Sequence, residues 1–167
     1  MRFAHAILAL SVAVALSGCG YRPLYGSSAE SAGVSAQLTS VAIPEATTRV
    51  GQLIRNDLLS GRGGGGGDRY TLNMTTVVRK SGVIDQPQPS VTRQSIRLAV
   101  DFELIEQGSG KTVYSGKTFS QASFDVIRQP FADLQAETNA TERAAHEVSG
   151  DIRTRLAAYF SKRSATP

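Results

Sequence analysis

The chain has 167 residues, with 18 basic and 14 acidic side chains that give a formal net charge of +4. This length allows one domain of ordinary size around a single core, and the mild positive charge does not require a nucleic-acid partner. The sequence has one cysteine, which excludes an internal disulfide and a multi-thiolate metal site. We therefore expect a fold that uses no disulfide, metal or cofactor.

The first 18 residues have the pattern of an export signal. Arg2 precedes an almost wholly apolar run, 6–16, which is shorter than the ~20 apolar residues of a membrane-spanning helix. The run leads into the sequence Leu-Ser-Gly-Cys, which ends at Cys19 and matches the lipobox of bacterial lipoproteins. In the proteins that this pattern resembles, a diacylglycerol is attached to the thiol and cleavage leaves an acylated cysteine as the first residue. The sequence therefore predicts a lipoprotein signal peptide over 1–18 and lipidation of Cys19, with an ordinary signal peptide as the alternative.

Residues 19–33 are rich in Gly, Ser and Ala, and this composition predicts a lipidated tether that leads to the folded domain. Acyl chains on Cys19 would make the anchor effectively permanent, because each buried methylene contributes about 0.8 kcal/mol. The residue after the cysteine is Gly20 rather than aspartate. By resemblance to the sorting rules of enteric bacteria, this choice favours the outer membrane.

A single domain is predicted over 34–160, and it begins with a strand and a helix. Residues 34–43 have strand composition, with Val34, Ala36 and Leu38 alternating on one face. A helix is predicted over 48–60, because a threonine can cap its start and apolar residues recur at helical spacing.

The glycine run Gly63–Gly67 follows this helix. It lacks the Gly-Lys-Ser/Thr ending of a phosphate-binding loop and leads into a strand rather than a helix, so its context excludes that function. We interpret the run as a flexible connection.

Three strands are predicted next, over 69–80, over 91–107 and from residue 111 onward, so that 69–123 forms an antiparallel meander with one buried face. The side chains expected on that face in the first two strands are Tyr70, Leu72, Met74, Val78, Ile96, Leu98, Val100, Phe102 and Leu104. The connection 81–90 is either a plain hairpin loop or a projecting contact with a partner.

The region 131–160 is predicted to be one long helix. Apolar residues recur about every four positions along it: Ala140, Ala144, Val148, Ile152, Leu156 and Phe160. The tail 161–167 is predicted to be disordered. The order strand, helix, three strands, helix predicts an α+β fold, with two helices packed on one face of a four-stranded, mainly antiparallel sheet.

The sequence offers little that points to catalysis. It has no Gly-x-Ser-x-Gly elbow, and His146 lies in the middle of the last predicted helix, where we interpret it as a surface or interface residue. Asp101 and Glu103 alternate with apolar residues, which favours solvated strand positions over a paired acid and base. We expect a protein that is not an enzyme.

Several basic residues on the predicted strands form a second group of candidates. Guanidinium groups bind phosphate through two parallel hydrogen bonds, so these strands could hold a phosphorylated glycolipid. The candidate residues are Arg79, Lys80, Arg93, Arg97 and Lys117. The alternative is a solvated outer face with no ligand.

These segments together resemble the LPS-assembly lipoprotein family LptE, especially its alphaproteobacterial branch. The most specific match is Cys-Gly-Tyr-Arg-Pro-Leu-Tyr at 19–25, and the other matching stretches are 49–61, 69–80, 96–125 and the closing helix that ends at 155–160. The resemblance covers nearly the whole chain after the signal peptide and implies lipid attachment at Cys19.

The resemblance implies an outer-membrane role without chemistry. Members of the LptE family sit inside the LptD barrel, plug it and help to deliver lipopolysaccharide to the cell surface. An LptD-type β-barrel and lipopolysaccharide are therefore the partners that the resemblance implies, with a lipid anchor on the periplasmic face of the outer membrane. The alternative is a lipid-anchored auxiliary subunit of another envelope transport complex without a barrel partner.

Overall fold

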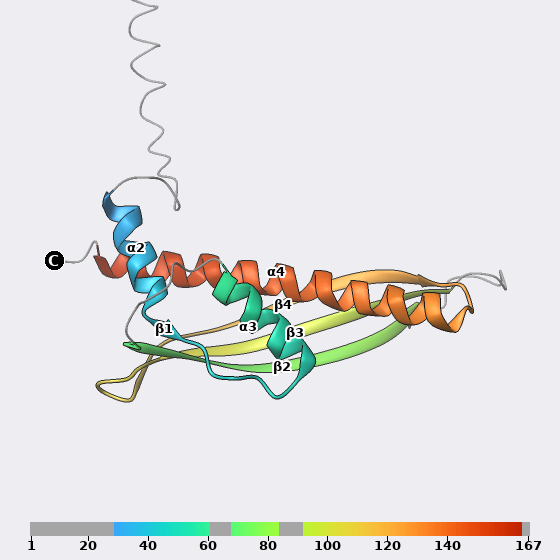
Figure 1. The fold of residues 1–167 in the computed structure, drawn as a ribbon, viewed down its shortest axis with the longest axis horizontal. Coiled ribbons are helices and arrows are strands. Elements are labelled where there is room, and N and C mark those ends of the chain that lie inside the picture. The colour runs from blue at the N-terminus through green and yellow to red at the C-terminus, as the bar shows by residue number, and fades with distance from the viewer. Residues whose placement is uncertain (1–28, 61–67, 84–91, 165–167) are drawn as a thin grey trace, which may run out of the picture.

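A computed structural model gives the fold, and it describes residues 29–60, 68–83 and 92–164 (Figure 1). The elements in chain order are α2 (Ala29–Thr39), β1 (Val41–Ala42), α3 (Arg49–Ser60), β2 (Tyr70–Val83), β3 (Thr92–Glu106), β4 (Lys111–Val126) and α4 (Pro130–Ser164). Cys19, the glycine run Gly63–Gly67 and most of the predicted connection 81–90 lie outside the described residues.

The four strands form one mixed sheet in the order β1-β2-β3-β4. The strands β2, β3 and β4 pair antiparallel along nearly their full lengths, whereas β1 pairs parallel with β2 only at Tyr70 and Thr71. The helix α4 packs across β3 and β4, and α3 packs against β2. The predicted α+β class with a four-stranded, mainly antiparallel sheet is therefore confirmed.

The core lies between this sheet and the helices, and the side chains of β3 show it most clearly. Every second residue of β3 from 96 to 104 points toward the helices and is at most 2% exposed. The predicted stripe on α4 faces the same core, because all six of its members are buried. The side chains that alternate along β3 and those that recur every four residues along α4 therefore pack together in one apolar layer.

The start of α3 is set by a side-chain cap. The hydroxyl oxygen of Thr48 accepts a hydrogen bond from the backbone N–H of Gly51 at 3.1 Å. This contact satisfies one of the N–H groups that the first helical turn leaves free. The predicted helix over 48–60 is confirmed to within one residue, and its Ile54 and Leu58 are buried in the core.

The prediction of a strand over 34–43 is wrong for most of that segment, which instead ends the helix α2. Val34 and Leu38 are four residues apart, so on a helix they share a face, and this face packs into the core beside α4. Only Val41 and Ala42 remain as a strand. The fold therefore has three described helices rather than the two predicted.

Two further details differ from the predicted pattern. Val78 is 45% exposed although its parity places it on the helix-covered face, because α3 packs against β2 without covering its second half. The helix α4 continues to Ser164, four residues beyond its predicted end at 160, and so enters the segment predicted as a disordered tail. A hydrogen bond of 3.1 Å from the Gln37 amide to the Ser164 hydroxyl ties this last turn to α2.

Candidate functional site

The side of the sheet away from the helices is covered by no element among the described residues, and we call it the open face. Its side chains come from the alternate positions of β2, β3 and β4. The register places Val77 beside Ala99 and Ala99 beside Phe119, so an apolar row crosses all three strands. Val77 is 45% exposed and Phe119 is 59% exposed, so this row is in contact with solvent.

Two arginines form the next row of the open face. Arg79 and Arg97 are direct cross-strand partners in the antiparallel pairing of β2 and β3. The Arg97 guanidinium lies 4.0 Å from the ring centroid of Phe119, in a cation–π contact. Among the described residues, the Arg79 side chain forms no hydrogen bond or ion pair. Two like charges are thus carried at directly opposite positions of β2 and β3, and neither forms an ion pair with a carboxylate of the described residues.

These residues line a shallow hollow of about 280 Å³. Its walls are Thr75, Val77, Arg79, Arg97, Ala99 and Asp101. Asp101 is already engaged, because its carboxylate accepts a hydrogen bond from the Lys117 ammonium at 3.0 Å. The hollow therefore combines two arginines with an apolar wall.

The other predicted phosphate contacts do not join this pair. Lys117 is paired with Asp101, and Arg93 is paired with Asp125 at 3.1 Å. Lys80 lies on the opposite, helix-covered side of the sheet, where its ammonium pairs with Glu137 of α4 at 2.5 Å. Of the five predicted residues, the structure brings together only Arg79 and Arg97 without an acidic partner.

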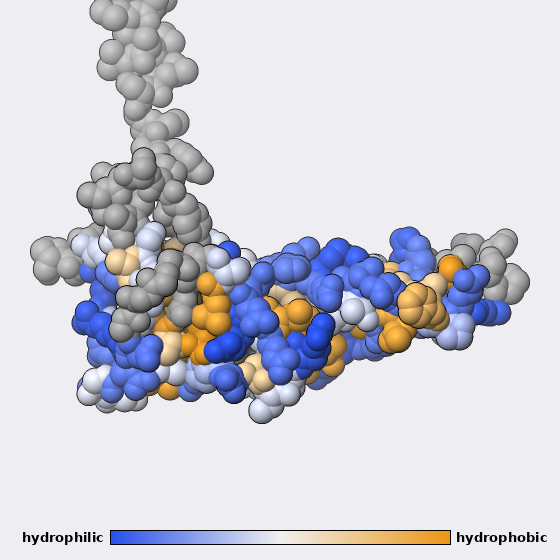
Figure 2. Space-filling view, viewed as in Figure 1, coloured by the Kyte–Doolittle hydropathy of each residue, from blue (hydrophilic) through white to orange (hydrophobic). Residues whose placement is uncertain are grey.

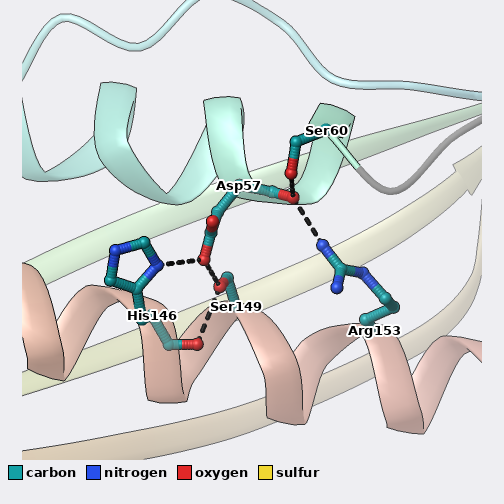
Figure 3. A network of polar contacts seen from close by, with 5 residues as sticks. All are labelled: Asp57, Ser60, His146, Ser149 and Arg153. Carbon is teal, nitrogen blue, oxygen red and sulfur yellow. Dashed lines mark hydrogen bonds and ion pairs between the residues drawn. The ribbon is translucent and has the colours of Figure 1, made fainter.

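A network of polar contacts joins α3 to α4 (Figure 3). The Asp57 carboxylate accepts hydrogen bonds from the His146 ring Nδ1 at 2.7 Å and from the Ser149 hydroxyl. The Arg153 guanidinium donates to the Asp57 backbone carbonyl at 2.5 Å. Since 146, 149 and 153 are spaced three and four residues apart, these side chains lie on one face of α4.

The environment of Asp57 changes the pKa of its carboxyl group. Burial raises the pKa, but the hydrogen bonds from Ser149 and His146 and the charges of His146 and Arg153 together outweigh burial and lower it below its ordinary value. Asp57 is therefore ionised at neutral pH and holds the two helices together as an acceptor.

The three residue types of this network are those of a hydrolase triad, but their connections are different. In a triad the histidine takes the proton of the serine. Here the Ser149 hydroxyl donates to Asp57 and to the His146 carbonyl, and Ser149 is only 1% exposed. The arrangement therefore clamps two helices together and does not activate a nucleophile.

The end of the molecule where α4 begins carries exposed apolar side chains. Figure 2 shows hydrophobic surface there, at the end opposite α2. Phe131 is 82% exposed, Leu134 is 64% exposed and Ile127 is 46% exposed. The backbone of this turn is held in place, because the Ile127 N–H donates to the Asp133 carboxylate at 2.8 Å. This apolar end was not anticipated from the sequence.

Two negative findings apply to the described ranges. No group of three or more His, Cys, Asp or Glu side chains there could hold a metal ion. No helix within them combines the length and the hydrophobicity needed to cross a membrane.

Comparison with solved structures relates the fold to three bacterial lipoproteins. A candidate lipoprotein from Caulobacter crescentus is 29% identical over 78% of this chain and 97% of its own, with a TM-score of 0.64. Rare lipoprotein B from Shewanella oneidensis is 14% identical over 74% and 96%, with a TM-score of 0.56. A minor lipoprotein from Acinetobacter baumannii is 15% identical over 71% and 89%, with a TM-score of 0.54.

No protein-family model matches the sequence, and no curated protein matches it. The similarity to the Shewanella and Acinetobacter proteins is one of fold. The chain spans nearly the full length of all three solved structures. It therefore has the same overall fold as these lipoproteins.

Proposed function

We propose that this chain is an outer-membrane lipoprotein of the LptE type, which plugs an LptD-type β-barrel and assists the delivery of lipopolysaccharide. One combined observation carries this proposal. A lipobox that ends at Cys19 precedes a domain whose fold is shared with three lipoproteins, among them rare lipoprotein B. The lipid would anchor the domain on the periplasmic face of the outer membrane.

The surface of the domain is compatible with a plug. The lumen of an outer-membrane barrel is polar, so a protein lodged inside it needs polar side chains over much of its surface. The open face supplies ion-paired rows, such as Lys117 with Asp101 and Arg93 with Asp125. The exposed residues Phe131 and Leu134 offer an apolar contact at one end. None of these features requires catalysis, and we propose that the protein is not an enzyme.

The direct test of the partner is an affinity purification. The protein, tagged after its last residue, is recovered from detergent-solubilised outer membranes, and the companion present in equal amount is identified. We expect a large β-barrel of the LptD type. Recovery of the protein alone, together with normal surface lipopolysaccharide after its depletion, would contradict the proposal. Recovery with an envelope complex that lacks a barrel, from the inner membrane, would favour the auxiliary-subunit alternative.

The anchor is tested separately by substitution at the lipobox. Cys19→Ala removes the thiol that carries the diacylglycerol, so we expect an unprocessed or misplaced protein. Gly18→Ala is the matched control, because it keeps a small residue beside the cysteine and should leave lipidation intact. Mass spectrometry of the intact native protein provides the readout. A processed product with an unmodified thiol would remove the anchor from the proposal.

The apolar end can be tested as a contact with the barrel. Phe131→Ser combined with Leu134→Ser should reduce the recovery of the barrel without unfolding the domain, because both side chains are mostly exposed. Val78→Ser is the control, since Val78 is also an exposed apolar residue but lies on β2. Equal recovery of the barrel with both variants would exclude this end as a contact.

A further inference from the structure

At one place on the open face, two positive side chains occupy directly opposite positions on neighbouring strands, which is unfavourable for the stability of the sheet. Like charges directly opposite each other on neighbouring strands destabilise a sheet, whereas opposite charges stabilise it. Two other cations on this face follow that rule, because Lys117 pairs with Asp101 and Arg93 pairs with Asp125. Arg79 and Arg97 are the exception, because they are direct cross-strand partners and neither forms an ion pair within the described part of the chain.

From this exception we infer that Arg79 and Arg97 form a binding site for a phosphate group carried on an apolar molecule. Two guanidinium groups can hold one phosphate through several charge-assisted hydrogen bonds. A doubly charged anion between them would also remove their mutual repulsion. The Arg97 side chain is already oriented, because it rests on the ring of Phe119 at 4.0 Å.

The neighbouring row of side chains indicates what is attached to the phosphate. Val77, Ala99 and Phe119 form the apolar row next to the arginines, and Val77 and Phe119 are about half exposed. A free inorganic anion would gain nothing from this row. An alkyl or acyl chain attached to the phosphate would bury it and gain about 25 cal/mol for each Å² removed from water.

The size of the hollow limits which part of the ligand it can hold. Its volume of about 280 Å³ lies near the lower end of the range for small-molecule sites, so it suits a phosphorylated headgroup rather than a whole lipid. A second hollow of about 470 Å³ shares Thr75 and Asp101 with it. A longer ligand could therefore continue along the open face.

The anion site rests on the charges and register of the described strands. The identification of its natural ligand as lipopolysaccharide rests in addition on the proposed function. The two can fail separately, because binding to the purified protein involves no barrel, whereas recovery of the barrel requires no occupied site.

The test measures binding to the purified full-length protein by calorimetry at constant ionic strength. The probes are n-decyl phosphate below its micelle concentration, inorganic phosphate, and n-decyl maltoside as a neutral amphiphile. We expect decyl phosphate to bind more tightly than either of the others. The double variant Arg79→Gln/Arg97→Gln should weaken that binding roughly tenfold or more, because it removes the charged hydrogen-bond donors.

The matched control is Arg93→Gln/Lys111→Gln, which removes the same charge from β3 and β4 at two exposed positions that do not line the hollow. It should change the affinity for decyl phosphate less than about twofold, since it leaves the pair of Lys117 with Asp101 in the wall of the hollow intact. Equal weakening by the two double variants would show general charge attraction only and would overturn the site. Thermal unfolding of each variant, followed by circular dichroism, separates loss of binding from loss of structure.

A third double variant tests whether the apolar row contacts the ligand. Val77→Ser/Ala99→Ser keeps Phe119, which orients Arg97, and should weaken the binding of decyl phosphate while leaving that of inorganic phosphate unchanged. Inorganic phosphate that binds as tightly as decyl phosphate would contradict an amphipathic ligand. Displacement of decyl phosphate by lipopolysaccharide would identify the natural ligand class, and failure of that displacement would contradict lipopolysaccharide as the ligand while leaving the anion site in place.

Discussion

The two faces of the sheet are built from the same three strands, and successive residues point alternately to one face or the other. On the covered face, Leu98 and Val100 are fully buried under α4. On the open face, their neighbours Arg97 and Asp101 are exposed. The side chains of the covered face therefore stabilise the fold, whereas those of the open face are accessible to a ligand. Substitutions one residue apart should consequently have very different effects.

The largest difference is expected between Phe102 and Glu103. Phe102 is 1% exposed and packs against Tyr114, with ring centroids 6.0 Å apart, so Phe102→Ala should lower the free energy of unfolding by about 3–5 kcal/mol. Glu103→Ala, on the open face, should change it by less than about 0.5 kcal/mol. Urea denaturation measures both. Similar losses from the two variants would show that the open face is also part of the packed structure.

Gly116 of β4 tests how closely the covered face is packed. A Cβ atom at this position would lie 2.6 Å from the Phe102 Cζ atom, so Gly116→Ala should destabilise the fold by about 1–3 kcal/mol. Gly150→Ala on α4 is the control, because nothing lies within 4 Å of its added Cβ and the helix should gain about 0.5–1 kcal/mol. A neutral Gly116→Ala variant would mean that the Phe102 ring moves at little cost.

The contact between α3 and α4 gives a pH-dependent prediction. The pKa of Asp57 is lowered in the folded protein, so its contribution to stability is fully present above the unfolded pKa of about 3.9 and is lost as the pH falls through the folded value. Asp57→Asn should cost about 1–2 kcal/mol at pH 7, because it replaces a charged acceptor by a neutral one.

This difference between wild type and variant should shrink as the pH is lowered below about 5. Asp151→Asn serves as the control, since the ion pair of Asp151 with Arg155 is an exposed i,i+4 pair and should contribute a few tenths of a kcal/mol. Denaturation curves at several pH values give the comparison. A difference at Asp57 that does not change with pH would show that its ionisation plays no part.

The two faces also show how far the sequence alone could predict the structure. The alternation in β3 and the four-residue spacing in α4 are long and regular, so the three antiparallel strands, the long helix and, apart from Val78, their buried faces were predicted correctly. The segment 34–39 is short, and Val34 and Leu38 fit both a strand and a helix. Its contact with α4, which no local pattern reveals, determines that it is helical.

The candidate site could be predicted only in part, for a similar reason. The sequence placed Arg79 and Arg97 on neighbouring strands, but their direct pairing depends on the register between β2 and β3. That register cannot be derived from a turn of unknown type. Likewise, the spacing of His146, Ser149 and Arg153 indicates one face of a helix, but Asp57 lies 89 residues before His146 and meets it only through helix packing.

The smallest predicted effect is on stability at the open face, and its sign matters more than its size. Arg79→Gln removes one of two adjacent like charges and no hydrogen bond, so in the absence of ligand it should raise the free energy of unfolding by a few tenths of a kcal/mol. Arg93→Gln breaks the pair with Asp125 and should lower it slightly or leave it unchanged.

Thermal unfolding at low ionic strength should resolve this contrast, because added salt screens the charges and would reduce the gain. A protein that becomes more stable when a side chain is removed is not using that side chain to hold its fold. If Arg79→Gln instead destabilises the domain as much as a core substitution, the arginine has a structural role on the open face. The distinction between a face for stability and a face for binding would then fail at this position.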